Sequence, residues 1–224
     1  MTLIIGPLPD PIDGCSIANF TLCKNLDKRN IKYQTINTNT KVVSSKQGNT
    51  FSLKKAISFF KVYLEVYKIF SSSIIYTTPG QTFFGILKYS PFYILCKLLR
   101  KPYIIHVHGN HLGTEYKLLT GLKKKIFYYL VSSASAGIVL SKSLKSNFTG
   151  LLPATKVYVV ENFAIDELYD TYNSSLKVRD KPVILFLSNL IAEKGILDVL
   201  DALIILKNAN IKFKAYLAGK MESE

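Results

Sequence analysis

The stretch Tyr103-Ile104-Ile105-His106-Val107-His108-Gly109 shows the pattern that decides the fold. A short apolar run ends in polar residues and a glycine, and an amphipathic segment follows it. Apolar runs without polar alternation are typical of strands that are buried on both faces of a parallel sheet. The same order of apolar run, polar loop and helical segment recurs along most of the chain.

This recurrence predicts alternating strands and helices. The strands are expected at Thr2–Gly6, Lys32–Ile36, Ser73–Thr77, Tyr103–Val107, Ala136–Leu140 and Val157–Val160. The helices are expected at Ser16–Lys28, Leu53–Phe70, Thr82–Leu99, Tyr116–Ser132 and Ser141–Phe148. Alternation of this kind predicts a doubly wound, Rossmann-like α/β fold with a parallel sheet.

A polar segment at 166–182 interrupts the alternation, and we interpret it as a linker after an N-terminal domain at 1–165. The pattern resumes at 183–224 with strand Val183–Leu187, helix Gly195–Lys207 and strand Phe213–Leu217. One such unit leaves both sheet edges and most of its apolar faces uncovered. We therefore expect an incomplete second domain. Either another chain completes it, or the sequence is truncated.

Composition and charge narrow the class of protein. The chain has 224 residues, of which 48% are apolar, and three cysteines without metal-ligand spacing, Cys15, Cys23 and Cys96. Because the sequence shows neither a signal peptide nor a membrane-spanning apolar run, we expect a cytoplasmic protein with reduced thiols. Residues 1–130 hold 18 basic and 5 acidic side chains, so nearly all of the net charge of +14 lies there. This half is expected to face nucleic acid, a phosphorylated small molecule or anionic lipid.

The loop after the first strand, from Gly6 to Ser16, contains three prolines and Gly14. Gly14 permits close backbone approach, and Ser16 is expected to cap the next helix. A helix N-terminus offers free N–H groups to a phosphate or carboxylate. The alternative is an ordinary turn between a strand and a helix.

All three histidines of the protein, His106, His108 and His111, fall within six residues at the end of the fourth strand. Ligands bind at this end of the strands in open α/β sheets, and His106 and His108 share one face of their strand. The alternatives are a polar ligand-binding loop, a purely structural trio and a zinc site. Zinc is the least favoured, because no Cys or carboxylate stands nearby in the sequence.

The second unit contains Phe186-Leu187-Ser188-Asn189-Leu190, followed by Glu193-Lys194-Gly195 at the start of a helix. A lysine beside a glycine at a helix N-terminus is suited to binding phosphate. The alternative for Lys194 is a solvated loop lysine.

In this order, the motifs resemble retaining glycosyltransferase family 4, which has the two-Rossmann GT-B fold. The loop around Gly14 resembles the family's N-terminal glycine loop, and Tyr103 to Gly109 resembles its strand ending in His-Gly. Ile138 to Leu144 and Val157 to Asn162 resemble two further strand ends, and Phe186 to Gly195 resembles the segment that opens the donor domain. The resemblance spans nearly the whole chain.

The resemblance implies transfer of a sugar from a nucleotide-diphosphate sugar to a glycan or lipid-linked acceptor, in surface polysaccharide or glycolipid synthesis. It places His108 in the active site, and Gly14, Asn189 and Lys194 at the donor phosphates. It implies neither a metal nor a cofactor. Stabilising the charge of the leaving diphosphate would be the main catalytic task.

Two features depart from the family. Ser188-Asn189 stands where many members have Gly-Arg, and the family's paired glutamates would lie beyond Gly219, outside these 224 residues. We therefore expect the chain alone to be inactive. The alternative functions are a non-catalytic acceptor- or membrane-binding subunit that pairs with a separate donor-domain chain, and an inactive fragment. A nucleic-acid binder is disfavoured because no nucleic-acid motif is present.

Basic and aromatic residues also predict peripheral binding to the cytoplasmic face of an anionic membrane. Three lysines recur every seven residues along the predicted helix Leu53–Phe70, and three more adjoin Ile126 and Phe127. Such mixtures bind lipid headgroups while aromatic rings enter the interface. Alternatively, the apolar residues pack on the sheet and the lysines are solvated. The residues predicted to face the acceptor or the membrane are Lys54, Lys61, Lys68, Lys123, Lys124 and Lys125.

Overall fold

The computed structural model describes residues 1–39, 60–163, 181–219 and 221. They divide into two compact units, one with residues 1–39 and 60–163 and the other with 181–219 and 221. All but the last two residues of the predicted linker, 166–182, lie outside the described residues, so the linker stays a prediction.

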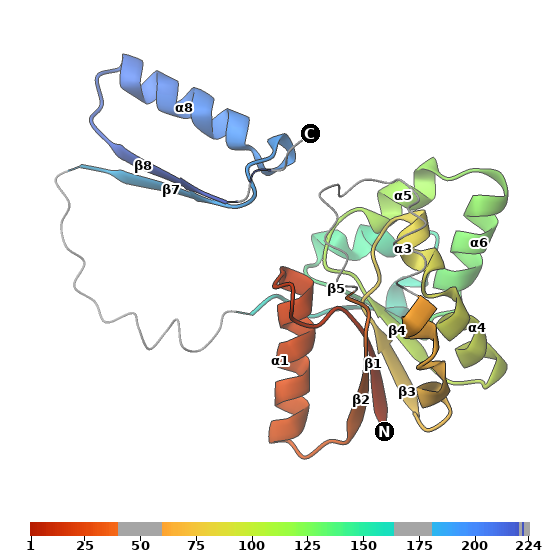
Figure 1. Ribbon diagram of the computed structural model, residues 1–224. Helices are drawn as coiled ribbons and strands as arrows, with labels where there is room; N and C mark the ends of the chain where they lie inside the picture. Colours follow the sequence, from red (N-terminus) through yellow and green to blue (C-terminus); the bar gives the residue numbers. More distant parts are fainter. Residues whose placement is uncertain (40–59, 164–180, 220, 222–224) are drawn as a thin grey trace. The chain divides into compact units, whose positions relative to one another are not determined.

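A six-stranded parallel sheet forms the centre of the first unit (Figure 1). Its strand order is β2-β1-β3-β4-β5-β6, so the order reverses between β1 and β3. Right-handed crossovers that run in opposite directions from such a point place helices on opposite faces. The strands are β1 (Thr2–Gly6), β2 (Tyr33–Asn37), β3 (Ile74–Thr77), β4 (Tyr103–His106), β5 (Ala136–Val139) and β6 (Val157–Val159).

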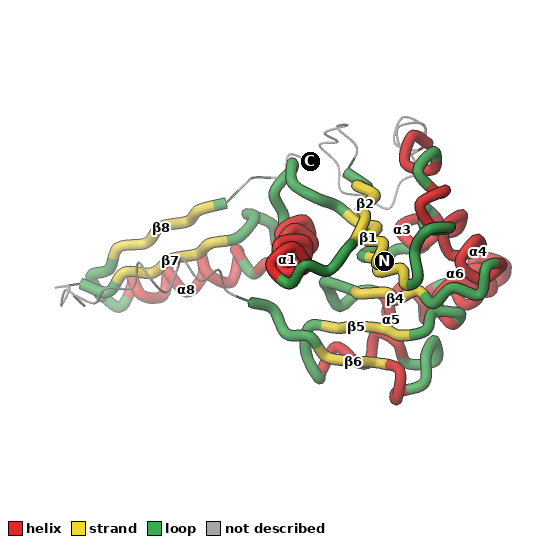
Figure 2. Tube along the Cα trace, turned by 90° about the horizontal axis from the view of Figure 1, so that it is seen from below, coloured by secondary structure: helices red, strands yellow, loops and turns green. Residues whose placement is uncertain are grey.

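Helix α1 (Gly14–Lys28) covers one face of the sheet, and α3 (Phe83–Leu87), α4 (Ser90–Leu98) and α6 (Gly121–Ser132) cover the other (Figure 2). Leu3, Ile5 and Ile105 from the strands are fully buried, as are Phe92 of α4 and Phe127 of α6. Because both faces are covered, the strands lack polar alternation, as the sequence indicated. The predicted Rossmann-like fold is therefore confirmed, and each predicted strand of the sheet overlaps an observed one.

The predicted helix Thr82–Leu99 is wrong as a single helix, because the chain forms α3 and α4 instead. Pro91 lies in the first turn of α4. Its nitrogen carries no hydrogen for an intrahelical bond, so it is tolerated at a helix start but not in a helix interior. Tyr116–Ser132 is likewise two helices, α5 (Leu112–Leu118) and α6, and Gly121 between them has a φ of +57°.

Two further helix predictions need correction. Residues 60–63 are helical, but a turn and the 3₁₀ helix η1 (Val66–Ile69) follow, so Leu53–Phe70 is not one continuous helix. The part of this prediction before residue 60 lies outside the described residues. The predicted helix Ser141–Phe148 is the 3₁₀ helix η2 (Ser143–Phe148).

The second unit contains two parallel strands, β7 (Val183–Leu187) and β8 (Lys214–Ala218), and helix α8 (Ile196–Asn208). The 3₁₀ helix η4 (Ala192–Lys194) precedes α8. Among the described apolar side chains of this unit only Ile196 is buried. The unit agrees with the predicted strand–helix–strand order, and it leaves most of its apolar surface exposed to solvent.

Candidate functional site

The loops that follow β1, β3 and β4 meet at the carboxyl edge of the first sheet. In open α/β sheets, ligands bind at this edge beside the point where the strand order reverses, here between β1 and β3. Asn19 of α1 joins the loops there, because its Nδ2 donates to the Pro7 carbonyl at 2.9 Å and to Thr78 Oγ1 at 2.8 Å. A Cβ on Gly6 would lie 2.0 Å from Thr78 Oγ1, so this contact requires glycine.

Asp13, not Ser16, is the N-cap of α1, so the sequence assigned the cap to the wrong residue. Asp13 Oδ1 accepts from the Ser16 N–H at 2.7 Å, and Ser16 Oγ accepts from the Asp13 N–H at 2.9 Å. The two side chains form a reciprocal capping box. Aspartate and serine are both good N-cap residues, and only the backbone geometry shows that the helix begins at Gly14.

The end of β2 holds the loop before α1 in place. Asn37 Oδ1 accepts from the Leu8 N–H at 3.1 Å, and Asn39 donates to the Leu8 carbonyl. No described atom lies within 4 Å of a Cβ placed on Gly14. Packing within the described chain therefore does not require glycine at this position, and the backbone beside it faces open space.

His106 and His108 lie together at the end of β4, with ring centroids 4.2 Å apart and an interplanar angle of 37°. The Tyr76 hydroxyl of β3 lies 2.6 Å from His106 Nδ1. The Nε2 atoms of both histidines are buried, and within the described residues neither has a hydrogen-bond partner. The two rings lie side by side, but β4 ends at His106, so His108 belongs to the loop after the strand and not to the strand itself.

Both imidazoles are neutral at ordinary pH. Burial, assisted by repulsion from a charged His108, lowers the pKa of His106 to about 3. Burial also lowers the pKa of His108, against the attraction of the Asp13 carboxylate. Gly14 follows β1 and His108 follows β4, and the carboxyl ends of these parallel strands lie at the same edge of the sheet. The two positions that the sequence singled out in this unit, Gly14 and His108, therefore belong to one edge of the sheet.

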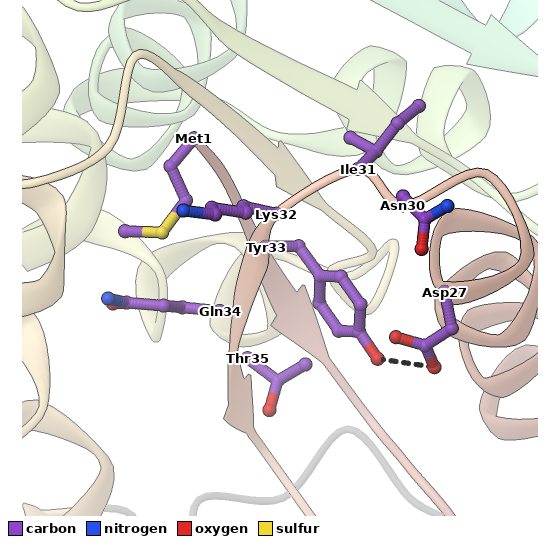
Figure 3. A pocket seen from close by; sticks show the side chains of 8 residues that line it. All are labelled: Met1, Asp27, Asn30, Ile31, Lys32, Tyr33, Gln34 and Thr35. Atoms are coloured by element: carbon purple, nitrogen blue, oxygen red, sulfur yellow. Dashed lines mark hydrogen bonds between the residues drawn. The ribbon is translucent and has the colours of Figure 1, made fainter.

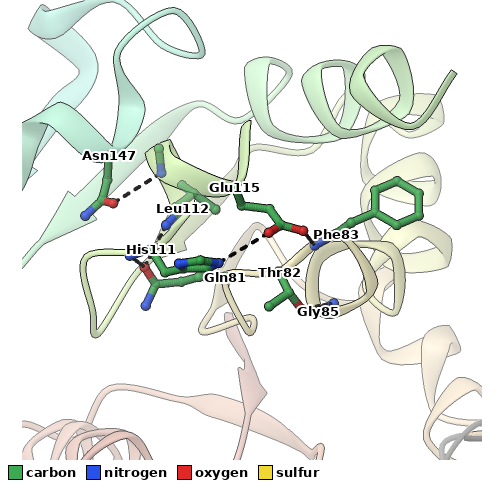
Figure 4. A network of polar contacts seen from close by, with 9 residues as sticks. Gln81, Thr82, Phe83, Gly85, His111, Leu112, Glu115 and Asn147 are labelled. Atoms are coloured by element: carbon green, nitrogen blue, oxygen red, sulfur yellow. Dashed lines mark hydrogen bonds and ion pairs between the residues drawn. The ribbon is translucent and has the colours of Figure 1, made fainter. Parts of the chain in front are cut away.

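The third histidine, His111, belongs to a different network (Figure 4). Its Nε2 lies 3.3 Å from Glu115 Oε2, and Glu115 Oε1 accepts from the Phe83 N–H at 2.7 Å. Gln81 Oε1 accepts from the N–H groups of His111 and Leu112 at 2.8 and 3.0 Å. The expected trio is thus a pair plus one histidine that helps to join the β3 and β4 loops.

Asn147 of η2 adds a third loop to this network. Its Oδ1 accepts from the Gly113 N–H at 3.3 Å, and its Nδ2 donates to the Gly109 carbonyl at 3.0 Å. A Cβ on Gly109 would lie 2.3 Å from Gln81 Nε2, which explains glycine after His108. Gln81, Glu115 and Asn147 were not predicted from the sequence. The expectation that no carboxylate stands near the histidines was wrong, because Glu115 is four residues after His111.

The described residues contain no group of three or more His, Cys, Asp and Glu side chains that could hold a metal ion. A cavity of about 810 Å³ opens at the opposite edge of the sheet, at the amino ends of β1 and β2 (Figure 3). The Tyr33 hydroxyl donates to Asp27 Oδ2 there at 3.1 Å. Ligands of open α/β sheets bind at the carboxyl edge, so we place the candidate site there and not in this cavity.

In the second unit, Asn189 and Lys194 lie on the same connection, between β7 and α8. Both residues are exposed. Gly195 is the N-cap of α8 with a φ of +79°, a conformation that favours glycine. A Cβ on Gly219 would lie 1.7 Å from the Ser188 carbonyl oxygen, so glycine lets the ends of β7 and β8 approach each other.

The predicted basic residues are in varied surroundings. Lys68 forms an ion pair with Glu65 and donates to the Thr35 carbonyl at 2.9 Å. On α6, Lys123 Nζ lies 5.8 Å from the Phe83 ring centroid and Lys124 Nζ 4.9 Å from that of Tyr116. Lys61 and Lys125 are exposed, and Lys54 lies outside the described residues. Lys61 and Lys68 do not share the continuous helical stripe that their spacing predicted.

The sheet order and the polar carboxyl edge define the first unit as a Rossmann-like α/β domain. No protein-family model matches the chain, and the comparison with curated proteins yields no match. Among solved structures, it is similar to a glycosyltransferase from Rickettsia africae ESF-5, with 18% identity and a TM-score of 0.52. It is also similar to a UDP-N-acetylglucosamine 2-epimerase from Rickettsia bellii, with 15% identity and a TM-score of 0.50.

The aligned region covers 97% of this chain in both comparisons, but only 60% and 62% of the two solved chains. The likeness therefore shows the fold, including the order of the two units, and the fold is of the GT-B type that the sequence predicted. One fold supports different reactions in these two proteins, so the choice between reactions depends on the site.

Proposed function

We propose that the chain is the acceptor-side domain and the first part of the donor domain of a glycosyltransferase. It would transfer a sugar from a nucleotide-diphosphate sugar to a glycan or lipid-linked acceptor, with retention, in surface polysaccharide or glycolipid synthesis. The observation that carries this proposal is the position of His108 at the same carboxyl edge as the loop before α1, with a buried Nε2 that has no partner among the described residues. The resemblance of the motifs to glycosyltransferase family 4 supports it.

The α1 N-terminus would bind the donor phosphates. The first N–H groups of a helix have no acceptor in a preceding turn, and at Gly14 and Cys15 they remain free of the capping box, which uses Ser16. The Asp13 carboxylate lowers the affinity of this helix end for a second anion, so a cation has to contribute. In the second unit, Lys194, on the same connection as Asn189, is the cation that the resemblance to family 4 assigns to the leaving diphosphate.

His108 would hold the donor sugar. Because burial lowers its pKa, the ring is a neutral hydrogen-bonding group at ordinary pH. A neutral imidazole suits an uncharged hydroxyl better than a phosphate. His108 would therefore position the sugar while the α1 N-terminus holds the phosphates.

A surface on α4, α6 and the segment around η1 would bind an anionic membrane. It exposes apolar and aromatic side chains, among them Leu98, which is 74% exposed. Lys97 Nζ lies 3.8 Å from the Tyr129 ring centroid, which joins α4 to α6. Between residues 60 and 132 the sequence has only two acidic residues, Glu65 and Glu115. In the described residues no helix is long and apolar enough to cross a membrane.

The test is transfer of radiolabelled sugar from a panel of nucleotide-diphosphate sugars to a membrane extract. The acceptor in this extract would come from the cytoplasmic face of the membrane. The purified chain is assayed alone and with a soluble extract of the cells from which it derives. We expect no transfer by the chain alone. With the soluble extract we expect transfer that requires the chain and that falls at least about tenfold in His108→Ala, since His108 would contact the reacting sugar. Lack of both transfer and nucleotide-sugar binding under either condition would overturn the proposal.

A second candidate is a non-catalytic subunit that pairs with a separate donor-domain chain. The observation that favours it is the exposed apolar surface of the second unit, where Leu187 is 75% exposed. A stable complex of the tagged chain with a separate nucleotide-sugar-binding chain, in which His108→Ala leaves transfer unchanged, would favour this candidate over a catalytic role for the chain.

A further inference from the structure

The histidine pair has a support that the sequence did not indicate. Tyr76 lies on β3, opposite Ile104 in the strand register, and its hydroxyl reaches across to His106 Nδ1 at 2.6 Å. His106 is only 6% exposed, and its ring in turn lies against His108. Tyr76, His106 and His108 therefore form one chain of contacts, from the strand next to the switch point out to the candidate site.

The first contact fixes the tautomer of His106. Burial raises the pKa of the Tyr76 phenol, so the hydroxyl keeps its proton and can donate it to Nδ1. No other acceptor for this hydroxyl is found among the described residues. A neutral imidazole whose Nδ1 accepts must carry its hydrogen on Nε2. His106 is thereby held in one tautomer and one ring orientation.

The second contact acts on His108. Two imidazoles whose centroids are 4.2 Å apart repel each other if both are charged. Among the described residues, the groups that face His108 are His106 at the end of β4, whose ring lies against it, and Asp13 on the loop before α1, whose charge attracts it, while Tyr76 on β3 contacts His106. Asp13 alone favours a charged His108, and burial opposes it. A fixed, neutral His106 ring leaves His108 one orientation.

We propose that Tyr76 and His106 are positioning residues, which hold the His108 ring in the plane and neutral form in which it binds an uncharged sugar hydroxyl. The inference rests on the proposed function for the ligand, but the Tyr76–His106–His108 arrangement is a property of the chain itself. It deepens that function because it explains how a site for a charged donor keeps a neutral group for the sugar.

The test uses the full chain with ¹⁵N-labelled histidine and two-bond ¹H–¹⁵N NMR spectra. The protein has three histidines, so single substitutions assign every signal. We expect His106 to be wholly in the Nε2–H tautomer and to stay neutral between about pH 5 and pH 8, because its pKa is far below this range. In Tyr76→Phe, both tautomers of His106 should be populated, and the His108 signals should broaden or shift.

The matched control is Tyr93→Phe. It also removes a buried hydroxyl next to β3, which lies 3.0 Å from Thr77 Oγ1, but its ring stacks on Tyr89 and Tyr103 and not on either histidine. We expect a similar loss of stability in Tyr93→Phe and an unchanged His106 tautomer. A mixed tautomer in the unsubstituted chain, or a tautomer that is the same in Tyr76→Phe, would overturn the proposal.

Ligand binding is tested separately with UDP-glucose and UDP as probes. If His108 meets the sugar, UDP-glucose should shift its ring nitrogens and UDP should not. Tyr76→Phe should weaken UDP-glucose binding about twofold, because with both His106 tautomers populated only about half of the molecules hold His108 in the binding orientation. A fixed tautomer together with no response of His108 to either probe would uphold the arrangement and count against the proposed function at this site. Equal shifts with both probes would overturn the assignment of His108 to the sugar.

Discussion

Glu115 shows how one buried side chain can hold the loops of the candidate site. Its side chain is almost fully buried, its Oε1 accepts from the N–H of Phe83 at the start of α3, and its Oε2 faces His111. A carboxylate at a helix N-terminus is stabilised by the N–H groups and the dipole there. Glu115 therefore joins the loops after β3 and β4, together with Gln81, which accepts from the N–H groups of His111 and Leu112.

We expect Glu115→Ala to lower the free energy of unfolding by about 1–3 kcal/mol, because it leaves the buried Phe83 N–H without its acceptor. Urea unfolding measures this change. The control is Glu65→Ala, which removes an ion pair with Lys68 whose side chains are 40% and 22% exposed. Such partly exposed pairs contribute about 0–1 kcal/mol. Equal losses in the two variants would show that Glu115 has no special structural role.

His106 should make stability depend on pH. Its pKa is lowered to about 3 in the folded protein, whereas an unfolded histidine has a pKa of about 6.5. Above pH 6.5 both states are neutral and the stability is fully present. As the pH falls from about 6.5 towards 3, only the unfolded chain binds the proton, so stability falls by up to about 1.4 kcal/mol per pH unit.

The measurement is the free energy of unfolding at about pH 7.5 and about pH 5, in the unsubstituted chain and in His106→Phe. We expect the variant to lose less stability between the two pH values, because it lacks the group that only the unfolded state protonates. The same loss in both proteins would mean that His106 is protonated in the folded state.

His106 and His108 could be identified from the sequence, because two histidines that are two residues apart at the end of an apolar run form a local pattern. Tyr76 could not be found in this way. It stands thirty residues earlier, and its contact with His106 depends on the register between β3 and β4, in which Tyr76 is opposite Ile104. The N-cap of α1 was misassigned for a related reason, since Asp13 and Ser16 are equally plausible caps until the backbone is known.

At the scale of elements, apolar strands were predicted well and helix boundaries were not. A buried strand is a short apolar run between loops, and that run is visible in the sequence. The long apolar segments around Pro91 and Gly121 have helical periodicity on both sides of the break, so periodicity alone joined them. Pro91 was the signal for a new helix, because a proline within an otherwise helical pattern commonly lies in the first turn of a new helix.

Helix α6 carries the strongest test of membrane binding. Its buried side chains include Phe127 and Leu130, while Tyr128 and Tyr129 are exposed beside three consecutive lysines. Each lysine near an anionic surface contributes about 1 kcal/mol. We expect Lys123→Glu/Lys124→Glu/Lys125→Glu to lose most binding to vesicles that contain phosphatidylserine, and the unsubstituted chain to lose it at high salt.

The control for this charge reversal is Lys24→Glu/Lys28→Glu/Arg29→Glu. It changes the net charge by the same amount at α1, which covers the opposite face of the sheet (Figure 2). Vesicle co-sedimentation should show binding close to that of the unsubstituted chain. If both triple variants bind equally poorly, the attraction depends on net charge alone. If the unsubstituted chain binds neutral vesicles as well as vesicles that contain phosphatidylserine, an electrostatic contribution from α6 is excluded.

At the scale of the whole molecule, the two units differ in how completely they are buried. The first has a sheet covered on both faces, with strand residues such as Ile5, Ile75 and Ile105 fully buried. The second has two strands and one helix, and its apolar side chains Leu185, Leu187 and Ile205 are each more than 60% exposed. The sequence predicted this contrast, because one βαβ unit cannot cover its own sheet.

This contrast predicts that β7, α8 and β8 exchange their amide hydrogens much faster than β1, β3 and β4. Ordering the backbone costs about 1–2 kcal/mol per residue, and the second unit buries too little apolar surface to offset that cost. Hydrogen exchange followed by mass spectrometry on the full chain measures both units in one sample, so the first unit serves as the internal control. Limited proteolysis should likewise cut first within 166–182 or after it.

Slow exchange throughout 183–219 at low protein concentration would show that the second unit is stable by itself. Slow exchange that appears only at high concentration, or only with a cell extract, would show that another chain covers the apolar surface of β7, α8 and β8.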